Sequence, residues 1–87
     1  MELRACLERL CEVPGAAGLP QAGQAAAEML RDYMEDVQTD ALGNVVGIRR
    51  CGKEDAPLLL LEAHIDEIGF VVTHTDEAGF AYVEPCG

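Results

Sequence analysis

Residues 57–70 read PLLLLEAHIDEIGF, an apolar run that leads at once into a group of polar side chains. After Pro57 come four leucines, Leu58–Leu61, with no alternation between apolar and polar residues. An uninterrupted apolar run of this length is typical of a strand that is covered on both faces. We therefore expect an α/β fold with a layered mixed sheet, in which Leu58–Leu61 is a central strand.

Two amphipathic helices are expected before this strand. Apolar residues recur at spacings of three and four between Leu3 and Leu10, and the Pro14-Gly15 pair ends that pattern. Pro20 suits the first turn of a second helix, because its missing N–H would have no partner there. The second helix is expected to run for about four turns, with one apolar face made of Ala22, Ala26, Met29, Leu30 and Tyr33.

Two hairpins complete the expected elements. The first spans residues 37–48 and turns at residues 41–44, where Gly and Asn tolerate a positive φ. The second spans residues 68–83 and turns at residues 75–79, with Gly near the end of the loop. No helix follows to cover a sheet of five strands, so we expect this polypeptide to be a piece of a longer protein.

The charge balance and the cysteine pattern exclude several functions. Six Lys and Arg against 16 Asp and Glu give a net charge of −10, and a surface this negative repels nucleic acid and anionic lipid. No apolar stretch approaches the roughly 20 residues of a transmembrane helix, and charges near the N-terminus do not fit a signal peptide. The four cysteines form no CxxC pair and predict no disulfide framework. We expect a cytoplasmic protein with neither nucleic-acid nor membrane partners.

The polar residues after the leucine run have the pattern of a metal site. In an extended chain, Glu62, His64 and Asp66 would project from the same face. A neutral imidazole is the commonest metal ligand, and its second nitrogen usually donates to a carboxylate such as Asp66. On this spacing alone the pattern is weak, because a single histidine beside a strand end is more often structural than a metal ligand. Glu67 fits an exposed charge, and His74 fits a structural residue of the second hairpin.

Three separated motifs carry a resemblance to a known family. They are Val13-Pro14-Gly15, the turn Asp40-x-Leu42-Gly43-Asn44-Val45, and the stretch from Ala63 to His74, which reads AHIDEIGFVVTH. In this order they resemble the N-terminal portion of the glutamyl aminopeptidase family. This family of co-catalytic metallo-aminopeptidases includes the tetrahedral aminopeptidases, and some members are described as endoglucanases. The likeness extends over essentially all 87 residues.

The resemblance implies a fold, a reaction and a site. Residues 1–70 would begin a catalytic α/β domain, and residues 71–87 would be the first strands of an inserted β-rich dimerisation domain. Two divalent ions, zinc or cobalt, would remove N-terminal residues from peptides in a homo-oligomer, from dimer to dodecamer. His64 matches a metal ligand, and Asp66 matches the catalytic acidic residue that orients it. The other ligands would lie beyond Gly87, so these residues alone would be inactive.

Two alternatives stay open at this point. The chain could be a small acidic binding or assembly module in which His64 is structural. It could also belong to a polysaccharide hydrolase, which needs two carboxylates about 5–9.5 Å apart around a glycosidic bond. Asp66 and Glu67 are adjacent and would point to opposite faces of a strand, so they do not form that pair.

Overall fold

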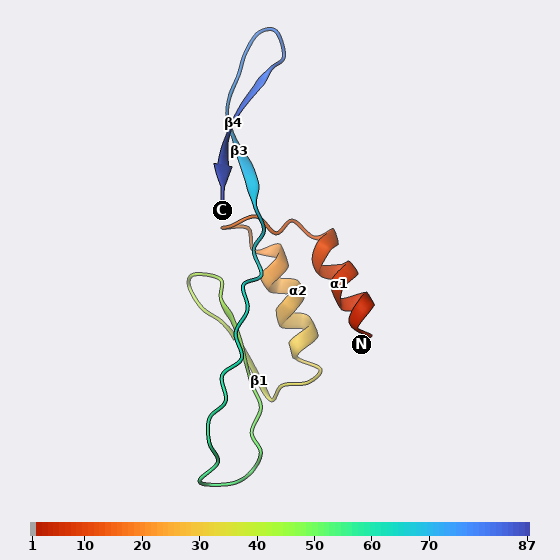
Figure 1. Cartoon of the computed structure of the whole chain (residues 1–87), viewed down its shortest axis with the longest axis vertical. Helices are drawn as coiled ribbons and strands as arrows, with labels where there is room; N and C mark the ends of the chain where they lie inside the picture. Colours follow the sequence, from red (N-terminus) through yellow and green to blue (C-terminus); the bar gives the residue numbers. More distant parts are fainter. Residues whose placement is uncertain (1) are drawn as a thin grey trace.

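The computed structural model describes residues 2–87 as two helices followed by two β-hairpins (Figure 1). Met1, the first residue of the expected catalytic part, lies outside the described residues. The α/β class expected from the sequence is confirmed. The elements are α1 (Leu3–Glu12), α2 (Gln21–Leu30), β1 (Asp36–Thr39), β2 (Val45–Ile48), β3 (Gly69–Thr75) and β4 (Ala81–Cys86).

Both helices lie where the sequence predicts them, although α2 is shorter than expected. The first ends at Glu12, ahead of the Pro14-Gly15 pair. The second has ten residues, about three turns. Beyond Leu30 the backbone tightens: the N–H of Asp32 donates to the carbonyl of Met29 at 3.4 Å, and the N–H of Tyr33 to that of Leu30 at 3.0 Å. Bonds of this i to i+3 type close a helix end, so Tyr33 lies outside the helix.

The small core lies along α2. This helix packs against α1 and also against both β1 and β2, so more than one of its faces is covered. Its buried side chains are Ala22, Ala25, Ala27 and Met29. The prediction of a single apolar face is therefore incomplete, because Ala25 and Ala27 were not part of it. Small alanine side chains allow neighbours on two sides to approach the helix axis closely.

The strands form two separate sheets rather than one mixed sheet, so that expectation was wrong. Each sheet has two antiparallel strands: β1 pairs with β2, and β3 pairs with β4. In the first sheet, Asp36 lies opposite Ile48 at one end and Thr39 lies opposite Val45 at the other. In the second sheet, Gly69 lies opposite Cys86 and Thr75 lies opposite Ala81, and β3 has a bulge between Val72 and His74. Among the described residues no third strand extends either hairpin, so neither grows into a layered sheet.

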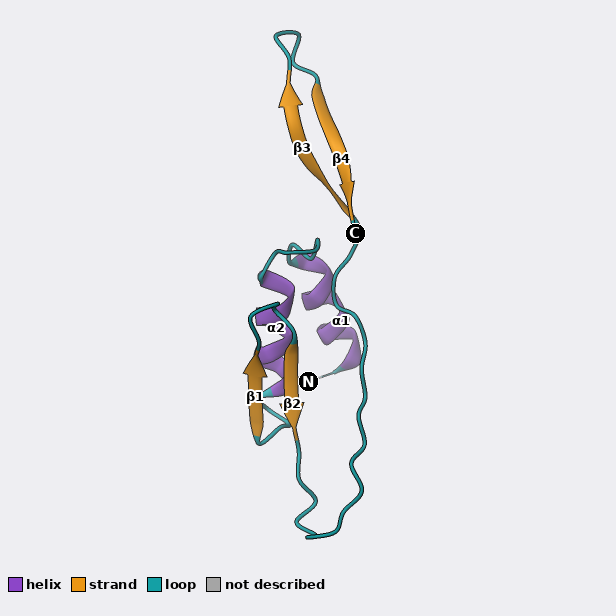
Figure 2. Cartoon of the chain, turned by 90° about the vertical axis from the view of Figure 1, so that its left-hand side faces the viewer, coloured by secondary structure: helices purple, strands orange, loops and turns teal. Residues whose placement is uncertain are grey.

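The leucine run is extended but unpaired, which overturns the central-strand prediction. Leu58–Leu61 belongs to no strand, and its residues are 75–97% exposed. The run lies in the long connection that follows β2 and returns past it (Figure 2). Leu58, Leu59 and Leu60 line a groove together with residues 46–49. An apolar run indicates that a segment tends to be covered, but a strand also needs a neighbour with matching hydrogen bonds, and the described residues supply none here.

Both hairpins turn through the same motif, a type I turn closed by a glycine in the left-handed region. In each, an aspartate Oδ1 accepts two backbone N–H groups of the turn, and the glycine has φ of +88°. The bonds join Asp40 to Leu42 and Asn44 at 2.9 Å, and Asp76 to Ala78 and Phe80 at 3.0 Å. The glycines are Gly43 and Gly79.

The molecule is elongated, with extents of 65 × 26 × 15 Å. Its radius of gyration is 17.6 Å, against about 12 Å for a compact domain of this length. The β3–β4 hairpin projects away from the helices (Figure 1) and contacts no other described helix or strand. In residues 2–87, neither helix has the length and apolar character needed to cross a bilayer.

Candidate functional site

The side chains of His64 and Asp66 lie together, at the exposed end of the long connection before β3. His64 Nδ1 is 2.9 Å from the backbone oxygen of Asp66 and 3.0 Å from Asp66 Oδ1. The side chains of the two residues are 86% and 50% exposed. The imidazole is therefore held at one nitrogen and open to solvent over most of its surface.

The partners of Nδ1 determine which nitrogen carries the proton. A peptide oxygen and a carboxylate oxygen both accept hydrogen bonds, so in the neutral ring Nδ1 carries the proton and donates it to them. Nε2 of His64 then keeps its lone pair. This is the tautomer that metal-binding histidines adopt when a carboxylate holds the other nitrogen. The pair fits one protein ligand of a divalent-cation site together with the group that orients it.

The loop between the two helices anchors this segment from the other side. The N–H of Glu67 donates to the carbonyl oxygen of Gly15 at 2.8 Å, and Ala16 and Glu67 form a parallel bridge. Gly15 is buried. A Cβ at Gly69 would lie 2.9 Å from the Cβ of Ala16, so a side chain at residue 69 would clash with the loop.

The other residues considered in the sequence have different surroundings. Glu62 is exposed and lies outside any strand, so no strand forms the predicted common face of Glu62, His64 and Asp66. The side chain of Glu67 lies along Gly15, whereas the carboxylate of Asp66 faces His64. The His74 ring lies against Tyr82, with centroids 5.6 Å apart. Asp66 and Glu67 thus have separate partners, and they do not face each other as a glycosidase pair would.

No complete metal site is present within residues 2–87. No group of three or more His, Cys, Asp and Glu side chains in this range is arranged to hold an ion. A catalytic zinc typically takes about three protein ligands. His64 therefore fits as one ligand of a set, while its role and that of Asp66 stay predictions.

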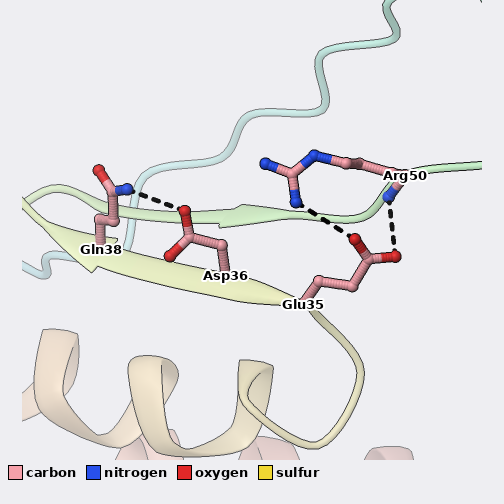
Figure 3. Close-up of polar contacts among 4 residues, drawn as sticks. All are labelled: Glu35, Asp36, Gln38 and Arg50. Atoms are coloured by element: carbon pink, nitrogen blue, oxygen red, sulfur yellow. Dashed lines mark hydrogen bonds and ion pairs between the residues drawn. The ribbon is translucent and has the colours of Figure 1, made fainter. Parts of the chain in front are cut away.

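A second polar cluster closes the open end of the β1–β2 hairpin (Figure 3). Arg50 donates from its backbone N–H and from Nη1 to the Glu35 carboxylate, at 3.3 and 3.2 Å. Gln38 Nε2 donates to Asp36 Oδ2 at 2.9 Å. Figure 3 shows these side chains on the side of the hairpin away from the helices. The carboxylates of Glu35 and Asp36 already accept hydrogen bonds, so we interpret this cluster as a structural contact.

Sequence reasoning missed the contribution of Gly15 and Ala16 to the site. Val13-Pro14-Gly15 stood out as a motif, but nothing in its spacing links it to a histidine about fifty residues away. The one available signal is that this small-residue loop and Gly69 both lack side chains that would keep two backbones apart.

Comparisons with known proteins agree on one family. A family model described as M42 glutamyl aminopeptidase matches residues 43–87. The lysyl aminopeptidase of Pyrococcus furiosus is 34% identical over 83 residues, which are 93% of this chain and 23% of that protein. FrvX of Escherichia coli, which carries an aminopeptidase name, is 35% identical over 75 residues, 85% of this chain and 20% of that protein.

The match covers a minor part of each relative. The chain spans about a fifth to a quarter of the length of these proteins. No solved structure matches the chain at a significant level. The family model nevertheless covers slightly more than half of the 87 residues, and it includes the whole stretch from the leucine run through His64 to Gly87. The chain belongs to the M42 glutamyl aminopeptidase family.

Proposed function

We propose that this chain is part of a metal-dependent aminopeptidase that removes N-terminal residues from peptides. The observation that carries the proposal is the His64–Asp66 pair: Nδ1 is held by Asp66 at 2.9 and 3.0 Å, which leaves Nε2 for a cation. The aminopeptidase names of the relatives support the same reaction. In this proposal two divalent ions, zinc or cobalt, act together, and residues outside 2–87 supply the remaining ligands.

The geometry of the two side chains supports the roles proposed for them. His64 would hold one ion through Nε2. Asp66 fixes the proton on Nδ1 and the direction of the ring, and it strengthens the imidazole as a ligand. When bound, divalent ions polarise a scissile carbonyl and lower the pKa of water so that hydroxide forms near neutral pH. Asp66 is thus the proposed catalytic acidic residue, acting through His64.

The proposal also covers domain organisation, assembly and location. Residues 1–70 would begin the catalytic domain, and residues 71–87 would begin an inserted β-rich dimerisation domain. The projecting β3–β4 hairpin, with its exposed apolar side chains, supports that division. We further propose a homo-oligomeric, cytoplasmic protein that acts on peptides. A net charge of −10 argues against nucleic-acid and anionic-membrane partners.

Metal content in the whole protein tests the proposal. His64→Ala is expected to remove one bound ion, measured by elemental analysis, together with the hydrolysis of peptide p-nitroanilides. Asp66→Asn keeps the ligand but weakens its orientation, so metal affinity should fall about 10–100-fold. His74→Ala is the matched control, because His74 lies against Tyr82 in the hairpin and should not affect metal content.

Two results would contradict the proposal. Unchanged metal stoichiometry in His64→Ala would remove this residue from the ligand set. Turnover of cellulose that persists in the presence of a chelator would favour the polysaccharide hydrolase alternative.

A further inference from the structure

One peptide group links the imidazole of His64 to the loop between the helices. The N–H of the Asp66–Glu67 peptide donates to the Gly15 carbonyl at 2.8 Å. The oxygen of the same peptide lies 2.9 Å from His64 Nδ1. A peptide group is planar and rigid, so fixing its N–H also fixes the direction of its oxygen. The position of the His64 ring is thereby coupled to the position of Gly15.

Little else fixes the ring. The His64 side chain is 86% exposed, so no packed core restrains it. Within residues 2–87, the polar partners of the ring are both on Asp66. The orientation of the imidazole therefore depends on how firmly the Asp66–Glu67 peptide is held.

Small residues allow the two backbones to meet. A Cβ at Gly69 would lie 2.9 Å from the Cβ of Ala16, a distance that real Cβ atoms essentially never show. The obstacle is a methyl group fixed to the backbone, so it cannot rotate away. On the other side of the contact, a Cβ at Gly15 would meet the Glu67 side chain at 3.4–3.5 Å. Contact between the loop and the His64 segment therefore depends on the absence of a side chain at residue 69.

We propose that Gly15 and Ala16, together with the Asp66–Glu67 peptide and Gly69, form an anchor that positions His64. We call this set the Gly15 anchor. The carbonyl of Gly15 is a positioning group that acts through the Asp66–Glu67 peptide. The purpose of the anchor, to aim Nε2 at a divalent ion, rests on the function proposed above. Its existence can be tested without any metal.

The test exchanges one methyl group across the contact. Gly69→Ala adds a methyl group that Ala16 obstructs, whereas Ala16→Gly combined with Gly69→Ala moves the methyl group from one side to the other. Gly47→Ala is the matched control, because its added Cβ also meets a neighbour at 2.8 Å, but that neighbour is the flexible Met34 side chain of another part of the fold. Helical circular dichroism of each full-chain variant verifies that α1 and α2 remain folded.

Two measurements report on the anchor at mildly alkaline pH, where free imidazole is neutral. Long-range nitrogen NMR correlations give the tautomer of His64, and amide exchange gives the protection of the Glu67 N–H. We expect Gly69→Ala to shift His64 from the Nδ1–H tautomer toward a mixture and to raise Glu67 exchange by up to about tenfold, as expected from the loss of one hydrogen bond. The double variant should restore both values, and Gly47→Ala should change neither.

Two other outcomes would contradict the proposed anchor. An unchanged His64 tautomer in Gly69→Ala overturns the anchor, and so does a double variant that fails to restore the native values. Titration of the whole protein, which includes the residues proposed to supply the remaining ligands, with zinc alone then separates this inference from the proposed function. If the anchor behaves as expected but zinc does not perturb the His64 resonances of the whole protein, the positioning role stands and the metal role fails.

Discussion

The β1–β2 and β3–β4 hairpins share one turn but have opposite surroundings. Both turns place an aspartate at the first position and a glycine with φ of +88° at the fourth. The first hairpin lies against α2, whereas the second contacts no other described helix or strand and meets the loop between the helices at Ala16 and Ala17. The comparison shows that the turn residues set the register of a hairpin, and that burial depends on what lies beside its strands.

The surfaces of the second hairpin are apolar despite their exposure. Phe70, Val72 and Tyr82 are 70%, 59% and 55% exposed. An isolated two-stranded hairpin is marginally stable in water at best. We therefore expect the two hairpins to differ in stability although their turns are alike, and three experiments can test or refine that difference.

The largest effect is expected where the first hairpin meets the helical part. Gly47→Val would place bulk against Met34, because even a Cβ at this position lies 2.8 Å from Met34 Cγ. Overpacking of this kind costs about 1–3 kcal/mol, measured as the free energy of unfolding in urea from the helical circular dichroism. Ala81→Val in the exposed β4 strand is the control and should change this free energy by less than about 0.5 kcal/mol. Equal losses at the two positions would contradict the difference between the hairpins.

An intermediate effect is expected from the two turn glycines. Gly43→Ala and Gly79→Ala place the same side chain at the same φ of +88°, and each should cost about 1 kcal/mol of backbone strain locally. Only Gly43→Ala should lower the stability of α2, because only the first hairpin packs on it. Gly79→Ala should instead increase amide exchange in β3 and β4 alone. A loss of helix stability in Gly79→Ala would show that the second hairpin is coupled to the helices.

Local patterns predicted the local elements well. The end of α1 before Pro14 and both hairpin turns depend on residues that are neighbours in sequence, such as Asp40 and Gly43. The prediction that Leu58–Leu61 is a central strand failed for a physical reason. Four leucines specify a tendency to be buried, whereas becoming a strand requires a partner edge that the pattern itself cannot identify. The prediction of a single mixed sheet depended on that strand, so it was wrong as well.

The candidate site likewise combines a local contact that the sequence predicts with a long-range contact that it does not. The spacing of His64 and Asp66 is local, and the sequence pattern predicted that the carboxylate would face the imidazole, as it does at 3.0 Å. The hydrogen bond from Glu67 to Gly15 joins segments separated by the whole α2–β1–β2 part of the chain. No periodicity or spacing specifies a contact over that distance. It depends on how the elements between them pack.

The smallest effect concerns the turn of the first hairpin and its pH dependence. The side-chain amide of Asn44 donates to Asp40 Oδ2 at 2.8 Å, and together with backbone N–H groups it holds the pKa of Asp40 below its ordinary value of 3.8. A carboxyl group with a lowered folded-state pKa stabilises the fold above 3.8, and that contribution is lost as the pH falls through the folded-state value. In the second hairpin, Phe80 takes the place of Asn44 and has no side-chain amide to donate.

Asn44→Ala tests this cause directly. The pKa of Asp40 should rise toward 3.8, because the hydrogen bond from the Asn44 side chain is the largest contribution to its lowering. The carboxyl carbon shift of Asp40, followed by NMR across the acid range, measures the change. Gln38→Ala is the control, since the Gln38 amide bonds Asp36 instead and its loss should leave Asp40 unaffected. An unchanged Asp40 titration in Asn44→Ala would assign the lowered pKa to the backbone N–H groups of the turn.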